Sequence, residues 1–172
     1  MSNGDIVAMA TFSRYRTAPG AGTLAAFLLV LIFGSPAYVR WVQSNTDEGS
    51  AGGWFMRLLA WPAWRFDAQD SVQSLIADDI KAILVVLLTW GFMVLLPGSQ
   101  LARARGGGSQ FLAGWAAYIF AGAFAALLAA FVQTNPTVLG AFNAAGSGAI
   151  YGFFVGWIVG AAALGGYRGT SS

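Results

Sequence analysis

The sequence contains no cysteine and no histidine. Without cysteine there is no disulfide, no thiolate nucleophile and no Cys-ligated metal site. Without histidine the chain lacks the commonest ligand of haem and transition metals, and the commonest general base at neutral pH. These absences exclude a His-ligated redox subunit, and we predict neither a metal nor a cofactor.

Charge is also scarce. Charged residues make up 9 % of the 172 residues and hydrophobic residues 57 %, whereas a soluble domain carries about 25 % charged residues. The net charge of +2 is small, and no basic cluster with interleaved aromatics suggests a phosphate track, so no nucleic-acid partner is predicted. The composition indicates a single integral membrane domain over 1–172.

The gaps between charges predict an all-α fold of four transmembrane helices, each of about 20 residues. In the first, Gly34-Ser35-Pro36 is expected to introduce a kink near the far end. The longest uncharged stretch contains a polar turn at 133–137, where Pro136 can begin a new helix. The predicted spans are 20–41, 80–97, 110–132 and 137–165.

The flanking charges predict the orientation of these helices. Every acidic residue except Asp5 lies within Asp47–Asp79, in the loop 42–79. The positive-inside rule therefore places this loop outside, and the segments 1–19, 98–109 and 166–172 in the cytoplasm. High alanine and glycine usage favours a bacterial source, and hence the bacterial inner membrane. The arginines that set the orientation are Arg14, Arg16, Arg103, Arg105 and Arg168.

The first apolar segment also has features of a signal peptide. Leu24–Phe33 follows Arg14 and Arg16 and precedes small residues at 35–37. We expect a retained anchor, because the chain begins at Met1.

Small residues recur every fourth position in the last two predicted spans. Such spacing lets helix backbones approach closely, and predicts a tight hairpin of the third and fourth helices. Packing is favoured over the alternative of a pore or a mobile helix. The two ladders are Gly140, Ala144, Gly148, Gly152, Gly156 and Gly160 in the fourth span, and Ala113, Ala117, Ala121, Ala125 and Ala129 in the third.

The glycine ladder is not a straight stripe. A four-residue step drifts by roughly 40° around a helix, so the ladder turns about halfway round over its length. Either the third helix crosses at a steep right-handed angle, or the two ends have different partners. We expect the second arrangement, with Gly140 and Ala144 facing the third helix and Gly156 and Gly160 meeting another partner.

The external loop contains an aromatic segment at 54–66 with two arginines. Such a segment favours the lipid headgroup zone, with aromatic rings at the interface and guanidinium groups reaching outward. Pro62 excludes one continuous helix there, so two short turns are expected. The residues predicted to contact lipid are Trp54, Arg57, Trp61, Trp64 and Arg65.

Few other polar residues are placed for chemistry. Asp78, Asp79 and Lys81 lie at the membrane entry of the second span, where a transporter carboxylate and a solvated helix start are alternatives, and we favour the solvated start. A polar strip in the fourth span is expected to hydrogen-bond to a neighbouring helix rather than to line a ligand pocket. This strip consists of Asn143, Ser147 and Tyr151.

Aromatic residues deep in the spans offer a surface to lipid, a pigment, a quinone or another subunit. The residues that form this surface are Trp90, Phe120, Phe124, Phe153, Phe154 and Trp157.

The sequence contains no phosphate-binding loop, dinucleotide fingerprint or HExxH motif. We therefore predict a non-catalytic accessory or assembly subunit of a larger membrane complex, of the respiratory, photosynthetic or secretion type. Its predicted partners are membrane lipids and other integral membrane subunits. A small oligomeric channel or transporter component is the alternative, and an enzyme that uses Asp78 or Asp79 is a third hypothesis.

Overall fold

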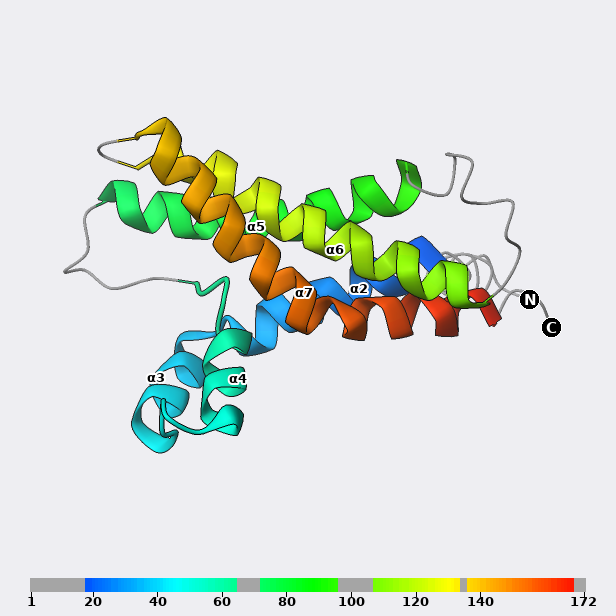
Figure 1. Cartoon of the computed structure of the whole chain (residues 1–172), viewed down its shortest axis with the longest axis horizontal. Helices are drawn as coiled ribbons and strands as arrows, with labels where there is room; N and C mark the ends of the chain where they lie inside the picture. Colours follow the sequence, from blue (N-terminus) through cyan, green and yellow to red (C-terminus); the bar gives the residue numbers. More distant parts are fainter. Residues whose placement is uncertain (1–17, 65–71, 96–106, 134–135, 169–172) are drawn as a thin grey trace, which may run out of the picture.

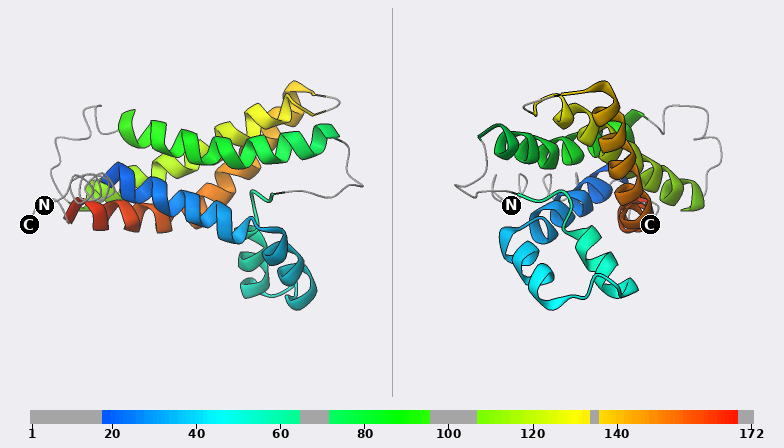
Figure 2. Two further views of the ribbon diagram at one scale, coloured as in Figure 1. Left: turned by 180° about the vertical axis from the view of Figure 1, so that it is seen from behind. Right: turned by 60° about the vertical axis from the view of Figure 1, so that its left-hand side comes forward.

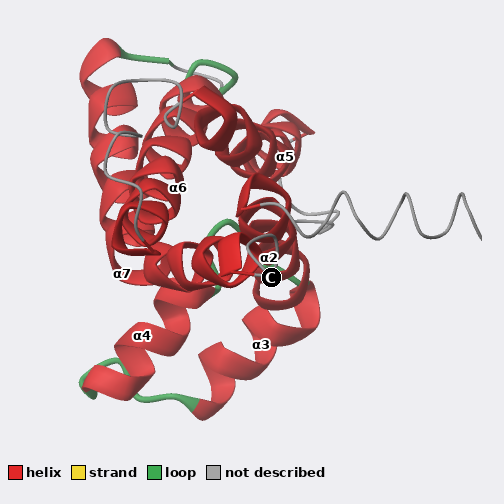
Figure 3. Cartoon of the chain, turned by 90° about the vertical axis from the view of Figure 1, so that its right-hand side faces the viewer, coloured by secondary structure: helices red, strands yellow, loops and turns green. Residues whose placement is uncertain are grey.

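The computed structural model describes residues 18–64, 72–95, 107–133 and 136–168, and its regular structure there is entirely helical, as predicted. Four helices that alternate in direction form a bundle (Figure 1). Two shorter helices project from the side of this bundle (Figure 3). The bundle helices are α2 (Ala18–Phe33), α5 (Val72–Leu95), α6 (Gly107–Ala130) and α7 (Val138–Arg168), and the projecting pair is α3 (Pro36–Asn45) and α4 (Ala51–Leu59).

Two of the described helices are long and apolar enough to cross a membrane. They cover Gly108–Ala130 and Val138–Gly166, and a third span is added if α2 and α3 are counted as one bent span. α2 alone has 16 residues, fewer than the roughly 20 that a span needs. α5 is longer, but Asp78, Asp79 and Lys81 interrupt its apolar surface. Length and composition therefore give two or three candidate spans within the described residues.

The predicted first span over 20–41 is not one kinked helix. α2 ends at Phe33 and α3 begins at Pro36, with a bend of 61° between them. The Ser35 side chain accepts a hydrogen bond from the backbone N–H of Tyr38 (3.2 Å), and Pro36 occupies the first turn. Serine at the N-cap followed by proline is a strong start signal for a new helix. The motif that was expected to kink the span thus breaks it.

The described residues of the predicted external loop 42–79 are mostly helical. Ser50 caps α4 by accepting a hydrogen bond from the N–H of Gly53 (3.0 Å), so α4 begins before the predicted aromatic segment. α5 begins at Val72 and continues into the second predicted span. Arg65 lies outside the described residues.

The segment 36–59, which we call the arm, is braced by Arg57. Its Nε donates to Thr46 Oγ1 (3.2 Å) and its Nη2 to the Thr46 carbonyl (2.9 Å), while Nη1 pairs with the Glu48 carboxylate. The Tyr38 hydroxyl donates to the Met56 carbonyl (3.1 Å), which joins α3 to α4. Arg57, predicted to reach lipid headgroups, is thus bonded to the turn within the arm.

Replacing Arg57 with glutamine should loosen the arm, because the shorter amide cannot span the partners of the guanidinium. We expect amide hydrogen exchange in α4 to become roughly fivefold faster, corresponding to about 1 kcal/mol for a partly exposed charged hydrogen-bond network. Exchange mass spectrometry in detergent measures this change. Arg40→Gln, at an exposed position on α3, is the matched control, and equal exchange in both variants would contradict the bracing role.

Candidate functional site

The closest helix contact in the molecule is between α6 and α7. A Cβ built at Gly152 would lie 2.6 Å from the Cα of Ile119, and one at Gly160 would lie 2.6 Å from the carbonyl oxygen of Phe111. Real Cβ atoms essentially never approach so closely. No described residue has a positive φ. The glycines are therefore required for space rather than for backbone conformation.

Two glycines of α6 complete this contact. A Cβ at Gly122 would lie 2.5 Å from the carbonyl oxygen of Gly148, and one at Gly114 would lie 3.0 Å from the Cα of Gly160. Sequence reasoning missed both residues, although they lie eight positions apart with Tyr118 midway between them. We call this contact the glycine seam, formed by Gly114, Gly122, Gly148, Gly152, Gly156 and Gly160.

The predicted division of the ladder between two partners is wrong. Gly156, expected to meet another partner, lies against Trp115 and Tyr118 of α6. Gly140, expected to face this helix, is exposed, and the only atoms near its added Cβ belong to Thr137 at the start of α7. Ala144 is half-buried. Four successive glycines of the ladder, from Gly148 to Gly160, contact α6. They can do so because the two helices cross, so that α6 runs along the winding line of glycines on α7 (Figure 1).

The alanine ladder of α6 lies on a different face from the seam. Ala117 and Ala125 are completely buried in a core cluster that also contains Val30 of α2 and Val85 of α5. The α6 atoms nearest the seam glycines of α7 come from other residues, such as Ile119 and Gly122. Of the remaining alanines, Ala121 and Ala129 are fully buried and Ala113 is half-buried.

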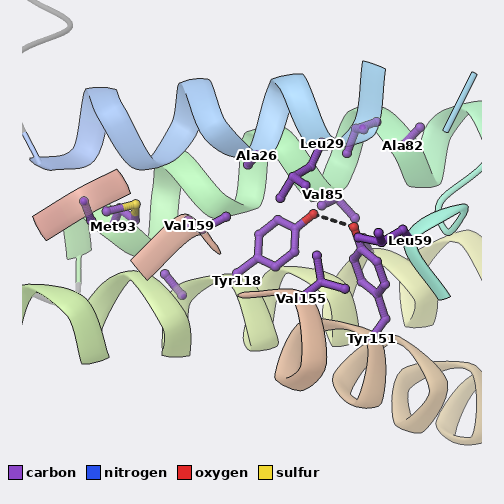
Figure 4. Packing of buried hydrophobic residues seen from close by; sticks show 14 of the residues in the cluster. Ala26, Leu29, Leu59, Ala82, Val85, Met93, Tyr118, Tyr151, Val155 and Val159 are labelled. Atoms are coloured by element: carbon purple, nitrogen blue, oxygen red, sulfur yellow. Dashed lines mark hydrogen bonds between the residues drawn. The ribbon is translucent and has the colours of Figure 1, made fainter. Parts of the chain in front are cut away.

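A tyrosine pair lies beside the seam in the core. The hydroxyls of Tyr118 and Tyr151 are 2.7 Å apart, and both side chains are fully buried (Figure 4). The predicted polar strip is therefore divided. Tyr151 points into the bundle, whereas Asn143 and Ser147 are exposed.

Residues 61–64, which we call the strap, lie over this core. The Trp61 ring lies 4.6 Å from the Tyr151 ring, and Lys81 Nζ lies 5.8 Å from the centre of the Trp61 ring. The Trp64 indole N–H donates to the Val30 carbonyl (3.1 Å), and its backbone N–H donates to the Gly34 carbonyl (2.8 Å). Trp61 and Trp64, both predicted to contact lipid, are thus bonded or packed within the protein.

One of the aromatic residues predicted to contact lipid, Trp54, remains partly exposed at the protein surface. Trp54 keeps 44 % of its surface exposed, and its ring lies edge-on to that of Phe154 on α7, with centroids 5.0 Å apart. A chain of ring contacts continues from Phe154 to Phe153 and on to Trp115. The arm therefore meets an aromatic face of the α6–α7 pair.

The ion pair of α5 is less solvated than expected. Lys81 Nζ lies 2.5 Å from Asp78 Oδ1, and these side chains are only 16 % and 20 % exposed, respectively. Together with the cation–π contact to Trp61, the pair connects α5 to the strap. Its role in the described structure is to support the strap.

The described residues hold no group of three or more His, Cys, Asp or Glu side chains placed to bind a metal ion. Among these same residues, every buried side-chain nitrogen or oxygen has a hydrogen-bond partner. No protein-family model, curated protein sequence or solved structure matches this chain. The candidate site is therefore defined by its own geometry, as a packed junction of seam, tyrosine pair and strap.

Gly152→Leu should separate α6 from α7, because the new side chain has backbone atoms of Ile119 and Tyr118 in its path. Overpacking of this kind costs about 1–3 kcal/mol or more. Unfolding by SDS, followed by circular dichroism, should show a lower midpoint. Gly165→Leu is the control, since a Cβ there meets nothing within 4 Å, and equal losses would show that the seam is incidental.

The tyrosine pair predicts non-additive substitutions. Tyr118→Phe or Tyr151→Phe alone leaves one buried hydroxyl without its partner, at a cost of about 1–3 kcal/mol. The double Phe variant removes both hydroxyls, and should be less destabilised than the sum of the single variants. The same SDS unfolding assay measures the three values. Strictly additive losses would mean that the two hydroxyls do not depend on each other.

Proposed function

We propose that this protein is a non-catalytic accessory or assembly subunit of a larger membrane complex. The arm is the observation that carries the proposal. It is braced internally by Arg57 and extends from the side of the bundle (Figure 3). It also exposes large apolar side chains at its surface. These side chains are Trp41, Trp54 and Met56, which are 49 %, 44 % and 40 % exposed. A rigid apolar projection of this kind favours contact with another subunit.

The proposed topology has four membrane crossings. The bundle helices α2, α5, α6 and α7 alternate in direction, and the start of α2 and the end of α7 lie at the same end of the bundle (Figure 1). The arginine distribution favours the cytoplasm for that end. The proposed location is the inner membrane of a bacterium, with both chain termini inside.

In this topology the arm lies along the outer surface of the membrane. α3 and α4 run across the direction of the bundle helices (Figure 2). Trp54 contacts Phe154 on the exposed side of α7. Tryptophan at that level favours the boundary between headgroups and acyl chains. Membrane lipids and a neighbouring integral subunit are therefore the proposed partners.

The glycine seam favours this proposal over an oligomeric channel. A glycine face that lines a path or slides against other copies has to be free, whereas here the space beside each seam glycine of α7 is filled by α6. The glycines thus serve packing within one chain. They are not available to a neighbouring chain.

Co-purification tests the proposed function. In mild detergent, the tagged protein should be recovered with a fixed set of larger membrane subunits in constant ratio. Trp41→Ser on the arm should reduce that recovery at least several-fold, because exposed tryptophans contribute strongly to interfaces. Trp90→Ser is the control, as an exposed aromatic on α5 away from the arm.

Other results would contradict the proposal. Recovery of only self-associated rings that carry solute flux in liposomes would support the channel alternative instead. If Trp41→Ser and Trp90→Ser reduced the recovery of partner subunits equally, the arm would not be the contact surface.

A further inference from the structure

The arm contacts the bundle at its two ends and along one side of α4. It follows α2 through the break at Gly34 and Ser35, and its last turn packs on the bundle core through Phe55 and the buried Leu59. Trp54 touches Phe154 of α7, and the strap follows directly after the arm. Its internal bonds, by contrast, join α3, the turn and α4 into one unit. Its direction relative to the bundle therefore depends on a short junction.

Trp64 supplies the donors that this junction needs. The carbonyls in the last turn of a helix have no partner within the helix. At the end of α2, the Val30 carbonyl accepts from the N–H of Gly34 (3.1 Å) and from the indole of Trp64, and the Gly34 carbonyl accepts from the backbone of Trp64. Trp64, 30 positions further along the chain than Gly34, thus gives the Val30 carbonyl a second donor and donates to the Gly34 carbonyl just beyond the end of α2.

There is no room for a side chain at residue 34, because the strap lies directly against it. A Cβ at this position would overlap the carbonyl oxygens of both Pro62 and Val30, and would lie 3.3 Å from Cδ1 of Trp64. The absence of a side chain at residue 34 is therefore what lets the strap lie against the end of α2.

Trp61 anchors the other end of the strap in the core. Its ring contacts the Tyr151 ring of α7 and the ammonium group of Lys81 on α5. The strap thus bonds to α2 through Trp64 and packs on α5 and α7 through Trp61.

We propose that the arm is a hinged element, with Gly34 and Ser35 as its hinge and the strap as the clamp that holds it in one direction. The clamp is closed while Trp64 caps α2, and lifting Trp64 leaves the arm held only by the hinge and by the packing of its last turn, Phe55 to Leu59, on the core. This inference concerns the motion of the arm and goes beyond the proposed function. It does not require any partner subunit.

Spin labels on introduced cysteines measure the direction of the arm, and the absence of native cysteine makes the labelling unambiguous. Gly52 on α4 and Gly146 on α7 are suitable sites, because a Cβ at either meets nothing within 4 Å. In the full-length protein in lipid nanodiscs, double electron–electron resonance should give one narrow distance distribution for this pair. Trp64→Phe, which removes the indole donor together with part of the ring, and Gly34→Ala should each broaden it or add a second maximum.

Two controls make the result decisive. Gly91→Ala, at an open position on α5, should leave the arm distribution unchanged, and a second label pair at Gly108 and Gly165 reports the α6–α7 pair in every variant. The proposal is overturned if both strap variants leave the arm distribution narrow and unshifted, or if the parent distribution is already broad. It is also overturned if the Gly108–Gly165 distance changes together with the arm distance, because the strap would then hold the bundle rather than the arm.

Discussion

The close approach of α6 and α7 is the contact on which the rest of the structure depends. Between apolar helices in lipid there is no hydrophobic driving force, so association relies on van der Waals contact and on hydrogen bonds across the interface. The seam provides the first of these, because the backbone of α6 occupies the space that side chains at Gly148 and Gly152 would fill. It also allows the second, by bringing the hydroxyls of Tyr118 and Tyr151 to 2.7 Å. Tyr151 then supports Trp61, and with it the strap that holds the arm.

Polar groups inside the bundle are paired, two of the pairs within α5 and one between α6 and α7. The Thr89 hydroxyl donates to the Val85 carbonyl of its own helix (2.6 Å), and the two tyrosines join α6 to α7. Lys81 pairs with Asp78 and also contacts the Trp61 ring. An unpaired polar group costs most where water is excluded, so such pairs favour one arrangement of the helices over alternatives with similar apolar contact. Faces made only of small residues look alike from one helical turn to the next, so they specify the register between two helices poorly. The tyrosine pair fixes the register that the seam permits.

The helical fold and the α6–α7 pair could be predicted from charge gaps and four-residue spacing, because both are periodic properties of local sequence. The orientation of the seam could not: spacing shows that Gly140 and Gly160 lie on one winding stripe, but not which part of that stripe faces α6. The break at Gly34 can also be predicted, because Ser35 followed by Pro36 is a signal for the start of a new helix. The strap was beyond sequence reasoning, since Trp64 and Val30 are 34 residues apart and an aromatic, arginine-containing segment is equally typical of a membrane interface.

Glycine serves two different purposes in this chain, and Tyr151 links them. At Gly148 and Gly152 the missing side chain admits a helix, and at Gly34 it admits the strap. Tyr151 lies between the first two glycines in sequence, bonds to Tyr118 across the seam, and packs against Trp61 of the strap. A shift of α7 along α6 by one turn, about 5.4 Å, would therefore break the tyrosine bond and remove the surface on which Trp61 rests. The position of the arm is thus tied to the register of the seam through Tyr151 and Trp61, and also through the contact of Trp54 with Phe154 of α7.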